Sequence, residues 1–269
     1  MKNWIFSLVL ALFIFSLPLP AIAAPAPEYN YTEEQLQQGE KLAQQAIEVS
    51  QQGKFMQAEQ LWTQLIEQFP TNPAVWSNRG NVRVSQNKLD EAIADFDQAI
   101  ELAPEYPDSY LNRGAALEAQ ERYDEAISDY EKVLAINPND AMAYNNRGNA
   151  KGGKGQWEDA IADYQEAVKL VPDFAFARAN YALALYQTEQ QQPAIRTMQE
   201  LVRKYPMFAD MRAALTAALW VKGNYGEAES NWVSVIGVDE RYQDLDWVEN
   251  IRRWPPKMVA ALDSFLNLE

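Results

Sequence analysis

Apolar residues recur along the chain at the spacing of α-helical faces, and the whole pattern returns every 34 residues. One alanine marks this register, and a proline and a small residue keep the same step. The three series are Ala58, Ala92, Ala126, Ala160, Ala194 and Ala228; Pro70, Pro104, Pro138, Pro172 and Pro206; and Ala46, Gly80, Gly114, Gly148 and Ala182. A fixed step of this length is typical of a repeat architecture. The register predicts six contiguous units, at 39–72, 73–106, 107–140, 141–174, 175–208 and 209–242.

Each unit is predicted to be a hairpin of two α-helices. The first helix carries a bulky residue at its fourth position and a small one at its eighth, as Trp76 and Gly80 do in the second unit. A small residue facing a bulky one lets two helices pack about 8–10 Å apart. The second helix carries the recurring alanine and a large residue four positions later, such as Ala92 and Phe96. The proline near the end of the unit cannot continue a helix, so it sets where the chain turns.

This pattern resembles the tetratricopeptide repeat over about three quarters of the chain. The matching positions include Trp76, Gly80, Ala92, Phe96, Ala99 and Pro104, and Tyr110, Gly114, Ala126, Tyr130 and Pro138. The resemblance implies an all-α, right-handed superhelical solenoid of six hairpins within 33–242, whose first helices line a concave surface. The fifth and sixth units depart from the pattern, with Arg178 and Arg212 at the bulky position and Gln191 in place of an aromatic. We expect these two units to pack more loosely.

Both ends of the repeat array are predicted to carry additional segments. Thr32 and Gln35 have the spacing of a capping box, so the first helix is expected to begin near Glu33, after a flexible lead-in at 24–32. Capping helices are expected at 243–269, to cover the apolar face of the last unit. The first contains Leu245, Trp247, Val248 and Ile251 and is broken by Trp254, Pro255 and Pro256, whereas the last carries Val259, Leu262, Phe265 and Leu266 and is expected to fold back over the sixth unit.

The N-terminal residues 1–23 have the features of a secretory signal peptide. Lys2 precedes an apolar run from Trp4 to Leu17, and Ala21 and Ala23 supply the small residues of a cleavage site. Cleavage is expected after Ala23, and the alternative is an uncleaved membrane anchor. The sequence therefore predicts export. Together with this N-terminus, the tail around Trp247 and Trp254-Pro255-Pro256 resembles tetratricopeptide proteins of the thylakoid lumen. That resemblance implies the thylakoid lumen, whereas the general case of an exported protein implies the periplasm.

Composition excludes several classes of function. The net charge of −15 at pH 7 repels nucleic acid, so nucleic acid is not expected as a partner. The chain contains no cysteine and no histidine, which removes the common metal ligands and the serine and cysteine triads. No metal and no cofactor is therefore expected, and an enzyme would have to depend on carboxylates, lysine or tyrosine.

Two patterns that could indicate chemistry have simpler explanations. The segment 148–155 has the glycine and lysine spacing of a phosphate-binding loop, but Gly155 stands where serine or threonine would hold magnesium, and no strand precedes it. Gly152 and Gly153 are expected to end the first helix of the fourth unit. The carboxylate pairs Asp95 with Asp97 and Glu158 with Asp159 are interpreted as a solvated acidic helix face.

The candidate binding residues lie on the first helices, which line the concave surface in this kind of repeat. Asparagine recurs at the sixth and ninth positions, and two aromatic residues are candidate anchors near the far end. The predicted set is Asn78, Asn81, Asn112, Asn146, Asn149, Asn180, Tyr186 and Trp220. Amide side chains offer donors and acceptors to a peptide backbone. The alternative is that the recurring Asn-Arg-Gly triplets have no binding role, with Arg79, Arg113 and Arg147 forming structural ion pairs to acidic second helices.

Some tetratricopeptide proteins bind the C-terminal carboxylate of heat-shock chaperones through two asparagines and three cations. Asn81 and Asn112 match the asparagine positions, but Ser77, Met142 and Asn146 occupy the cation positions. Without these charges the surface is expected to prefer internal, neutral or apolar segments.

The expected function is a non-catalytic scaffold or assembly factor that binds partner proteins, membrane-protein complexes among them. Membrane contact is expected only through a partner or an uncleaved anchor. Two alternatives remain open: a carboxylate-dependent hydrolase acting on cell-wall glycan, and a self-associating architectural protein whose groove is filled by its own N- or C-terminal segment.

Overall fold

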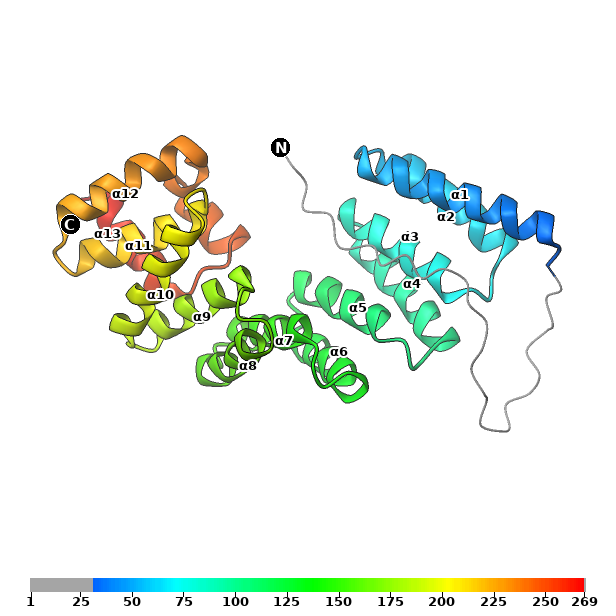
Figure 1. Ribbon diagram of the computed structural model, residues 1–269, viewed down its shortest axis with the longest axis horizontal. Helices are drawn as coiled ribbons and strands as arrows, with labels where there is room; N and C mark the ends of the chain where they lie inside the picture. The colour runs from blue at the N-terminus through cyan, green and yellow to red at the C-terminus, as the bar shows by residue number, and fades with distance from the viewer. Residues whose placement is uncertain (1–30, 269) are drawn as a thin grey trace. The chain divides into compact units, whose positions relative to one another are not determined.

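The computed structural model describes residues 31–268, so the predicted signal peptide and most of the predicted lead-in lie outside the described residues (Figure 1). The described part forms thirteen α-helices and two short helices of other types, without strands. They are α1 (Glu33–Gln51), α2 (Phe55–Gln68), α3 (Pro73–Ser85), α4 (Leu89–Leu102), α5 (Pro107–Ala119), α6 (Tyr123–Ile136), α7 (Ala141–Gly153), α8 (Trp157–Leu170), α9 (Ala175–Gln187), α10 (Gln191–Lys204), α11 (Ala209–Val221), α12 (Tyr225–Val238), the 3₁₀ helix η1 (Glu240–Gln243), the π-helix η2 (Trp247–Ile251) and α13 (Pro256–Leu266). The prediction of an all-α fold made of successive hairpins is confirmed.

The chain divides into two compact units, Met1–Ala116 and Leu117–Glu269. Odd-numbered helices from α1 to α11 are the first helices of hairpins 1 to 6, and even-numbered helices from α2 to α12 are the second helices. Within the units, α3 packs on α4, α7 on α8 and α11 on α12. Each of α2, α8 and α10 also packs on the first helix that follows it. The hairpins joined by these contacts complete one another's interiors, as expected for a repeat protein.

The small residue at the eighth position of the first helix is required by close packing. A Cβ atom built on Gly80 would lie 2.7 Å from the Phe96 ring, and one on Gly148 would lie 2.6 Å from the Tyr164 ring. These distances leave no space for a side chain, so the predicted fit of small against large is confirmed in hairpins 2 and 4. The rings themselves are buried and fill the layer between the two helices.

The predicted capping box at the start of α1 is confirmed. The backbone N–H of Gln35 donates to Thr32 Oγ1 at 3.2 Å, and the backbone N–H of Thr32 donates to Gln35 Oε1 at 2.8 Å. The helix begins at Glu33, as expected. Tyr31, which precedes the cap, packs its ring 4.8 Å from that of Phe69.

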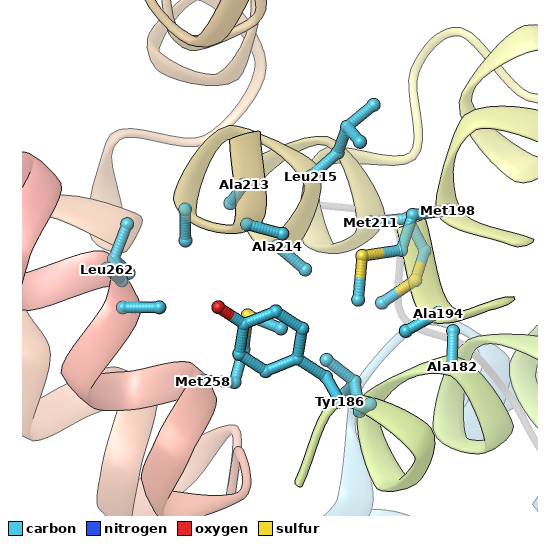
Figure 2. Close-up of a cluster of buried hydrophobic side chains, with 14 of the residues drawn as sticks. Ala182, Tyr186, Ala194, Met198, Met211, Ala213, Ala214, Leu215, Met258 and Leu262 are labelled. Carbon is cyan, nitrogen blue, oxygen red and sulfur yellow. The ribbon is translucent and has the colours of Figure 1, made fainter. Parts of the chain in front are cut away.

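The prediction of looser packing in the fifth and sixth hairpins is wrong. Helices α9, α10, α11 and α13 share a buried cluster, part of which is drawn in Figure 2. Its members include Ala182, Tyr186, Ala194, Met198, Met211, Ala213, Ala214, Met258 and Leu262. Many alanines on α9 and α11 let the helices approach closely, and large residues of α10 and α13 fill the remaining space. The arginines at the fourth position therefore leave no gap in these hairpins, because the alanines and the large residues of α10 and α13 fill the core instead.

The C-terminal helix covers the last hairpin, as predicted, although its cover extends to the fifth. Helix α13 packs on α11 and also reaches α9, and Figure 1 shows it in red beside α11. Met258 and Leu262 are fully buried there. The preceding segment differs from a regular helix: it forms the π-helix η2, in which Val248 is buried and Ile251 is 66% exposed. The helix expected around these residues is therefore present as a short π-helix, with Ile251 at its exposed end.

Candidate interaction surface

In the unit Leu117–Glu269, the first helices α7 and α9 bring their asparagines together. Asn180 Nδ2 on α9 donates to Asn145 Oδ1 at 3.0 Å and to Asn149 Oδ1 at 2.9 Å, both on α7. Asn145 Nδ2 in turn donates to Asn146 Oδ1 at 3.1 Å. The predicted residues Asn146, Asn149 and Asn180 therefore belong to one cluster, which we call the amide network.

Helix α8, the second helix of hairpin 4, holds the amide network through a hydrogen bond. The Tyr164 hydroxyl on α8 donates to Asn149 Oδ1 at 3.0 Å, and Tyr164 is almost completely buried. Burial raises the pKa of Tyr164, so its hydroxyl stays protonated and keeps this role as a donor. Asn146, Asn149 and Asn180 keep part of their surface exposed. The network is therefore held in place while some of its polar atoms still face solvent.

Two exposed apolar side chains lie on the same helix faces as the amide network. Met142 precedes Asn145 by three residues and Asn149 by seven, and Phe176 precedes Asn180 by four, which are the spacings of one helical face. Met142 and Phe176 are each 44% exposed. The sequence analysis missed both as apolar contact residues, although their spacing from the asparagines was the signal that could have identified them.

Further apolar side chains lie next to Phe176, in the turn between α10 and α11. The Phe176 ring packs on that of Phe208, with centroids 5.9 Å apart and planes inclined at 77°. Met207, next to Phe208, is 72% exposed. The amide network is therefore a polar strip with apolar side chains at one end. We call Met142, Phe176 and the amide network the α7/α9 surface.

The predicted aromatic anchors lie elsewhere, under the C-terminal helix. Tyr186 is 4% exposed and belongs to the buried cluster with Met258 and Leu262 (Figure 2). Trp220 is partly buried and packs edge-on against Phe265, with centroids 5.3 Å apart. While α13 occupies this position, Tyr186 is not accessible to another protein, and Trp220 is accessible only in part.

Asp210 at the start of α11 fixes the segment that leads into α13. Its Oδ1 accepts the Tyr242 hydroxyl at 2.7 Å, the Trp254 indole N–H at 3.0 Å and Arg252 Nη2 at 2.8 Å. Asp210 is buried, so these three donors replace water around its charge. Further along, Lys257 donates its backbone N–H to Gln187 Oε1 at 2.9 Å on α9. The C-terminal segment is thus fastened to both α11 and α9.

A partly buried carboxyl group, that of Glu118, lies where the same segment reaches the end of α5. Arg253 donates to the backbone carbonyls of Glu118 at 3.0 Å and Ala119 at 3.3 Å. The Tyr130 hydroxyl donates to Glu118 Oε2 at 3.2 Å. Burial raises the pKa of Glu118 to about 7, although the Tyr130 hydrogen bond and the charge of Arg253 act in the opposite direction. Nothing in the sequence pattern marked Glu118.

The remaining predicted asparagines belong to the other unit. Asn78 and Asn81 lie on α3 and Asn112 on α5, all partly exposed. Among the described residues, their side-chain amides form no network like that of α7 and α9. Their predicted role in binding stays a prediction.

The ion pairs that the alternative interpretation of the Asn-Arg-Gly triplets expects between first and second helices are present. Arg79 Nη2 lies 2.7 Å from Asp95 Oδ1, Arg113 Nη1 lies 2.5 Å from Asp97 Oδ1, and Arg147 Nη2 lies 2.6 Å from Asp163 Oδ1. The interpretation of Asp95 as part of a solvated face is wrong, because Asp95 is only 2% exposed and also accepts from Arg83. Glu158 and Asp159 are exposed, as expected.

The phosphate-loop spacing at 148–155 has no such geometry here. Helix α7 ends at Gly153, as predicted, and Gly155 follows it with a φ of 76°, a turn conformation that favours glycine. The rings of Trp157 and Tyr123 fill the space beside Gly152 and Gly153. These glycines allow close packing.

Two further properties of the described residues bear on chemistry and membranes. Over residues 31–268, no group of three or more aspartate or glutamate side chains is arranged to hold a metal ion. In that same stretch, no helix combines the length and apolar character that crossing a bilayer requires.

Solved structures with a similar fold are repeat proteins. PilF of Pseudomonas aeruginosa superposes with a TM-score of 0.67 at 16% identity, covering 77% of this chain and 95% of PilF. MamA from Desulfovibrio magneticus RS-1 gives a TM-score of 0.56 at 21% identity, covering 61% and 93%. YrrB, described as a TPR protein with an unusual peptide-binding site, gives 0.52 at 23% identity, covering 66% and 92%. At these identities the likeness shows the fold alone.

No curated protein matches the sequence. The sequence profiles of the tetratricopeptide repeat, in contrast, match most of the repeat array, at residues 44–107 and 78–141, 141–174 and 180–206. These matches cover more than half of the chain and agree with the hairpins of the structure. The chain therefore belongs to the tetratricopeptide-repeat family.

Proposed function

We propose that the protein is a non-catalytic scaffold that binds segments of partner proteins on the α7/α9 surface, in an exported compartment. The observation that carries the proposal is the amide network next to the exposed side chains of Met142 and Phe176. Amides can pair with the N–H and C=O groups of an extended peptide, and the two apolar side chains can contact an apolar side chain of that peptide. Protein binding is the usual role of this family.

The composition of the surface indicates which segments it would bind. Its polar groups are neutral amides, and its exposed apolar groups are a thioether and a phenyl ring. A partner with a free carboxylate would find no cation among these groups. Neutral internal segments with large apolar side chains, such as those exposed by membrane-protein complexes during assembly, are therefore the proposed ligands.

Site-directed photocrosslinking in intact cells tests this function. A benzophenone amino acid at position 142 should crosslink a discrete partner, whereas the same group at the exposed position 128 on α6 should not. Asn180→Asp, which places a charge in the network, should reduce the crosslink at 142 at least fivefold. Equal labelling from 142 and 128, or an unchanged yield with Asn180→Asp, would contradict the proposal.

Export is proposed from the sequence of residues 1–23 alone, and it has its own test. The mature protein should begin at Ala24 and should be protected from protease until the outer barrier of its compartment is opened. A chain that retains Met1 in a soluble cytoplasmic fraction would contradict export without affecting the α7/α9 surface.

One observation favours the alternative of a groove filled by the chain itself. Helix α13 covers α11 and part of α9, the first helices of hairpins 5 and 6. This part of the first-helix surface is therefore occupied by the protein's own C-terminal segment. A truncation after Gln243 should expose it, and stronger binding of apolar peptides by the truncated chain would show that the site is otherwise blocked.

A further inference from the structure

Helix α8 presents a row of three positions to α9, the first helix of the next hairpin. In α8 the row is Ile161, Gln165 and Val168. Gln165 Nε2 donates to the Tyr181 hydroxyl on α9 at 3.0 Å, Ile161 packs in a cluster with Tyr181, and Val168 packs beside Ala177. We call these three positions the stacking row.

The stacking row of α2 shows what a following helix must supply. The row is Glu59, Thr63 and Ile66, and α3 lies on it. Arg83 Nε of α3 lies 2.9 Å from Glu59 Oε1, and Arg79 Nη1 donates to Thr63 Oγ1 at 3.2 Å. Val75 and Val82 of α3 are buried. A helix with buried valines and correctly placed arginines therefore completes this row.

The same row recurs on α12, where no first helix follows. At the fixed repeat step its members are Glu229, Val233 and Ile236, so the outer two residues are those of α2. The chain continues instead into η1, η2 and α13, and α13 packs on α11. Val233 is 75% exposed, and a Cβ atom built on Gly226 or Gly237 would meet nothing within 4 Å.

We propose that the stacking row of α12 is a docking site for an amphipathic helix of another protein, which packs there as a seventh first helix. This surface is separate from the α7/α9 surface and adds a second kind of partner. Because Val233 replaces the polar Thr63, the partner helix should carry an apolar residue where α3 has Arg79. Because Glu229 corresponds to Glu59, the partner should carry a basic residue where α3 has Arg83.

Charge and register argue against a second copy of this chain as the occupant. Helix α12 contains Glu227 and Glu229 and no lysine or arginine, so two such helices would bring like charges together. In a head-to-tail stack, α1 of a second copy would pack on the row of α12. This is also unfavourable, because α1 has Lys41, Gln45 and Glu48 where α3 has Val75, Arg79 and Val82. Those polar residues could not cover Val233.

A designed helical peptide provides the test. The probe is a lactam-stapled, fluorescent peptide with the sequence of residues 73–88 and the change Arg79→Leu, titrated with the full chain and followed by anisotropy. Val233→Lys should weaken its binding at least tenfold, while Val221→Lys, at an exposed position outside the row, should leave it unchanged. Circular dichroism should show the same helix content for both variants.

A charge reversal sharpens the test. Glu229→Arg should weaken binding of the probe at least fivefold, and a probe that also carries Arg83→Glu should recover it. Failure of the probe to bind the full chain, equal binding by Val233→Lys, or absence of the recovery would overturn the proposal. Sedimentation that shows a dimer broken by Val233→Lys would also overturn it, in favour of a second copy.

Discussion

Hairpins 2 and 6 solve the same packing problem with different chemistry. In hairpin 2 the two helices are joined by a buried carboxylate, Asp95, which accepts from Arg79 and Arg83 at 2.7 and 2.8 Å. At the equivalent positions hairpin 6 has Leu215 and Asn231 in place of Arg79 and Asp95. There the helices are joined by alanine packing and by the cover of α13.

The difference shows that the repeat step fixes where helices lie but not which interaction holds them. Ion pairs are directional, and removing one partner leaves the other as an uncompensated charge. Apolar contacts are less directional but depend on filling the available volume. The two regions should therefore respond differently to truncation, to loss of charge and to pH.

The largest effect is expected from Leu262→Ala in α13. Leu262 is fully buried against α11, and removing three of its carbons leaves a cavity as well as losing buried apolar surface. We expect a loss of about 3 kcal/mol in the free energy of unfolding, measured by urea denaturation. Leu268→Ala, at a position 73% exposed just beyond the helix, should change it by less than about 0.5 kcal/mol. Equal small effects would show that α13 does not stabilise hairpin 6.

A smaller loss is expected from Asp95→Ala in hairpin 2. The variant leaves Arg79 and Arg83 partly buried without their acceptor, which should cost about 2 kcal/mol. Asp97→Ala is a matched control, because its side chain is 55% exposed and its ion pair with Arg113 should contribute about 0.5 kcal/mol or less. Double-mutant cycles with Arg79 would separate the pair from the helix itself, and a coupling near zero would contradict the role given to Asp95.

One glutamate in each unit should change the free energy of unfolding with pH, and the two changes should have opposite signs. Burial opposes ionisation of Glu59, but hydrogen bonds from Lys88, Arg83 and Gln86 outweigh it and lower the pKa of Glu59 from 4.5 to about 2. Its contribution is present above pH 4.5 and is lost as the pH falls towards 2. Glu118 has the opposite shift, from 4.5 to about 7. The folded state therefore loses stability as the pH rises from 4.5 towards 7.

Each pH dependence can be removed by one substitution. Glu118→Gln should abolish the decline between pH 4.5 and 7, which we expect to be about 1–2 kcal/mol after solvent screening. Glu59→Gln should instead flatten the acid limb below pH 4.5. Unfolding by urea across this pH range measures both, and a wild-type profile without a decline above pH 4.5 would contradict the raised pKa of Glu118.

Much of the fold followed from sequence because packing at a fixed step leaves a periodic record. Gly80 and Gly148 are small since a ring lies against each of them, and Thr32 with Gln35 marks the first helix start by a local rule. The packing of the last two hairpins could not be read in this way. It depends on α13, which is distant in sequence and makes its contacts through nonperiodic residues.

The candidate site was predictable only in part. The asparagine series identified three members of the amide network, because a repeated polar residue on a helix face is visible in the sequence. It could not reveal that these amides bond to one another, which depends on the distance between α7 and α9. Nor could it show that α13 covers Tyr186, since helical spacing alone does not tell a buried ring from an exposed one.

The smallest effects concern the turn inside each hairpin, where the structure has a positive φ at every repeat step. Glycine occupies this position at Gly53, Gly155 and Gly223, with φ of 75°, 76° and 87°, but Glu121 and Glu189 adopt φ of 61° and 66°. A side chain is strained in this conformation, so Glu121→Gly should stabilise the fold by about 0.5–1 kcal/mol in urea denaturation. A destabilised Glu121→Gly variant would show that this turn is not strained.

Glu189→Gly, at the equivalent turn of hairpin 5, should stabilise the fold less than Glu121→Gly does. Glu189 has an additional partner, because Lys257 Nζ at the start of α13 lies 2.8 Å from its Oε1. Glu189→Gly therefore relieves the backbone but also removes a contact that holds the C-terminal segment on α9. We expect a smaller gain than for Glu121→Gly, together with faster hydrogen exchange in α13. A larger gain at Glu189 than at Glu121 would mean that α13 is held by its apolar face alone.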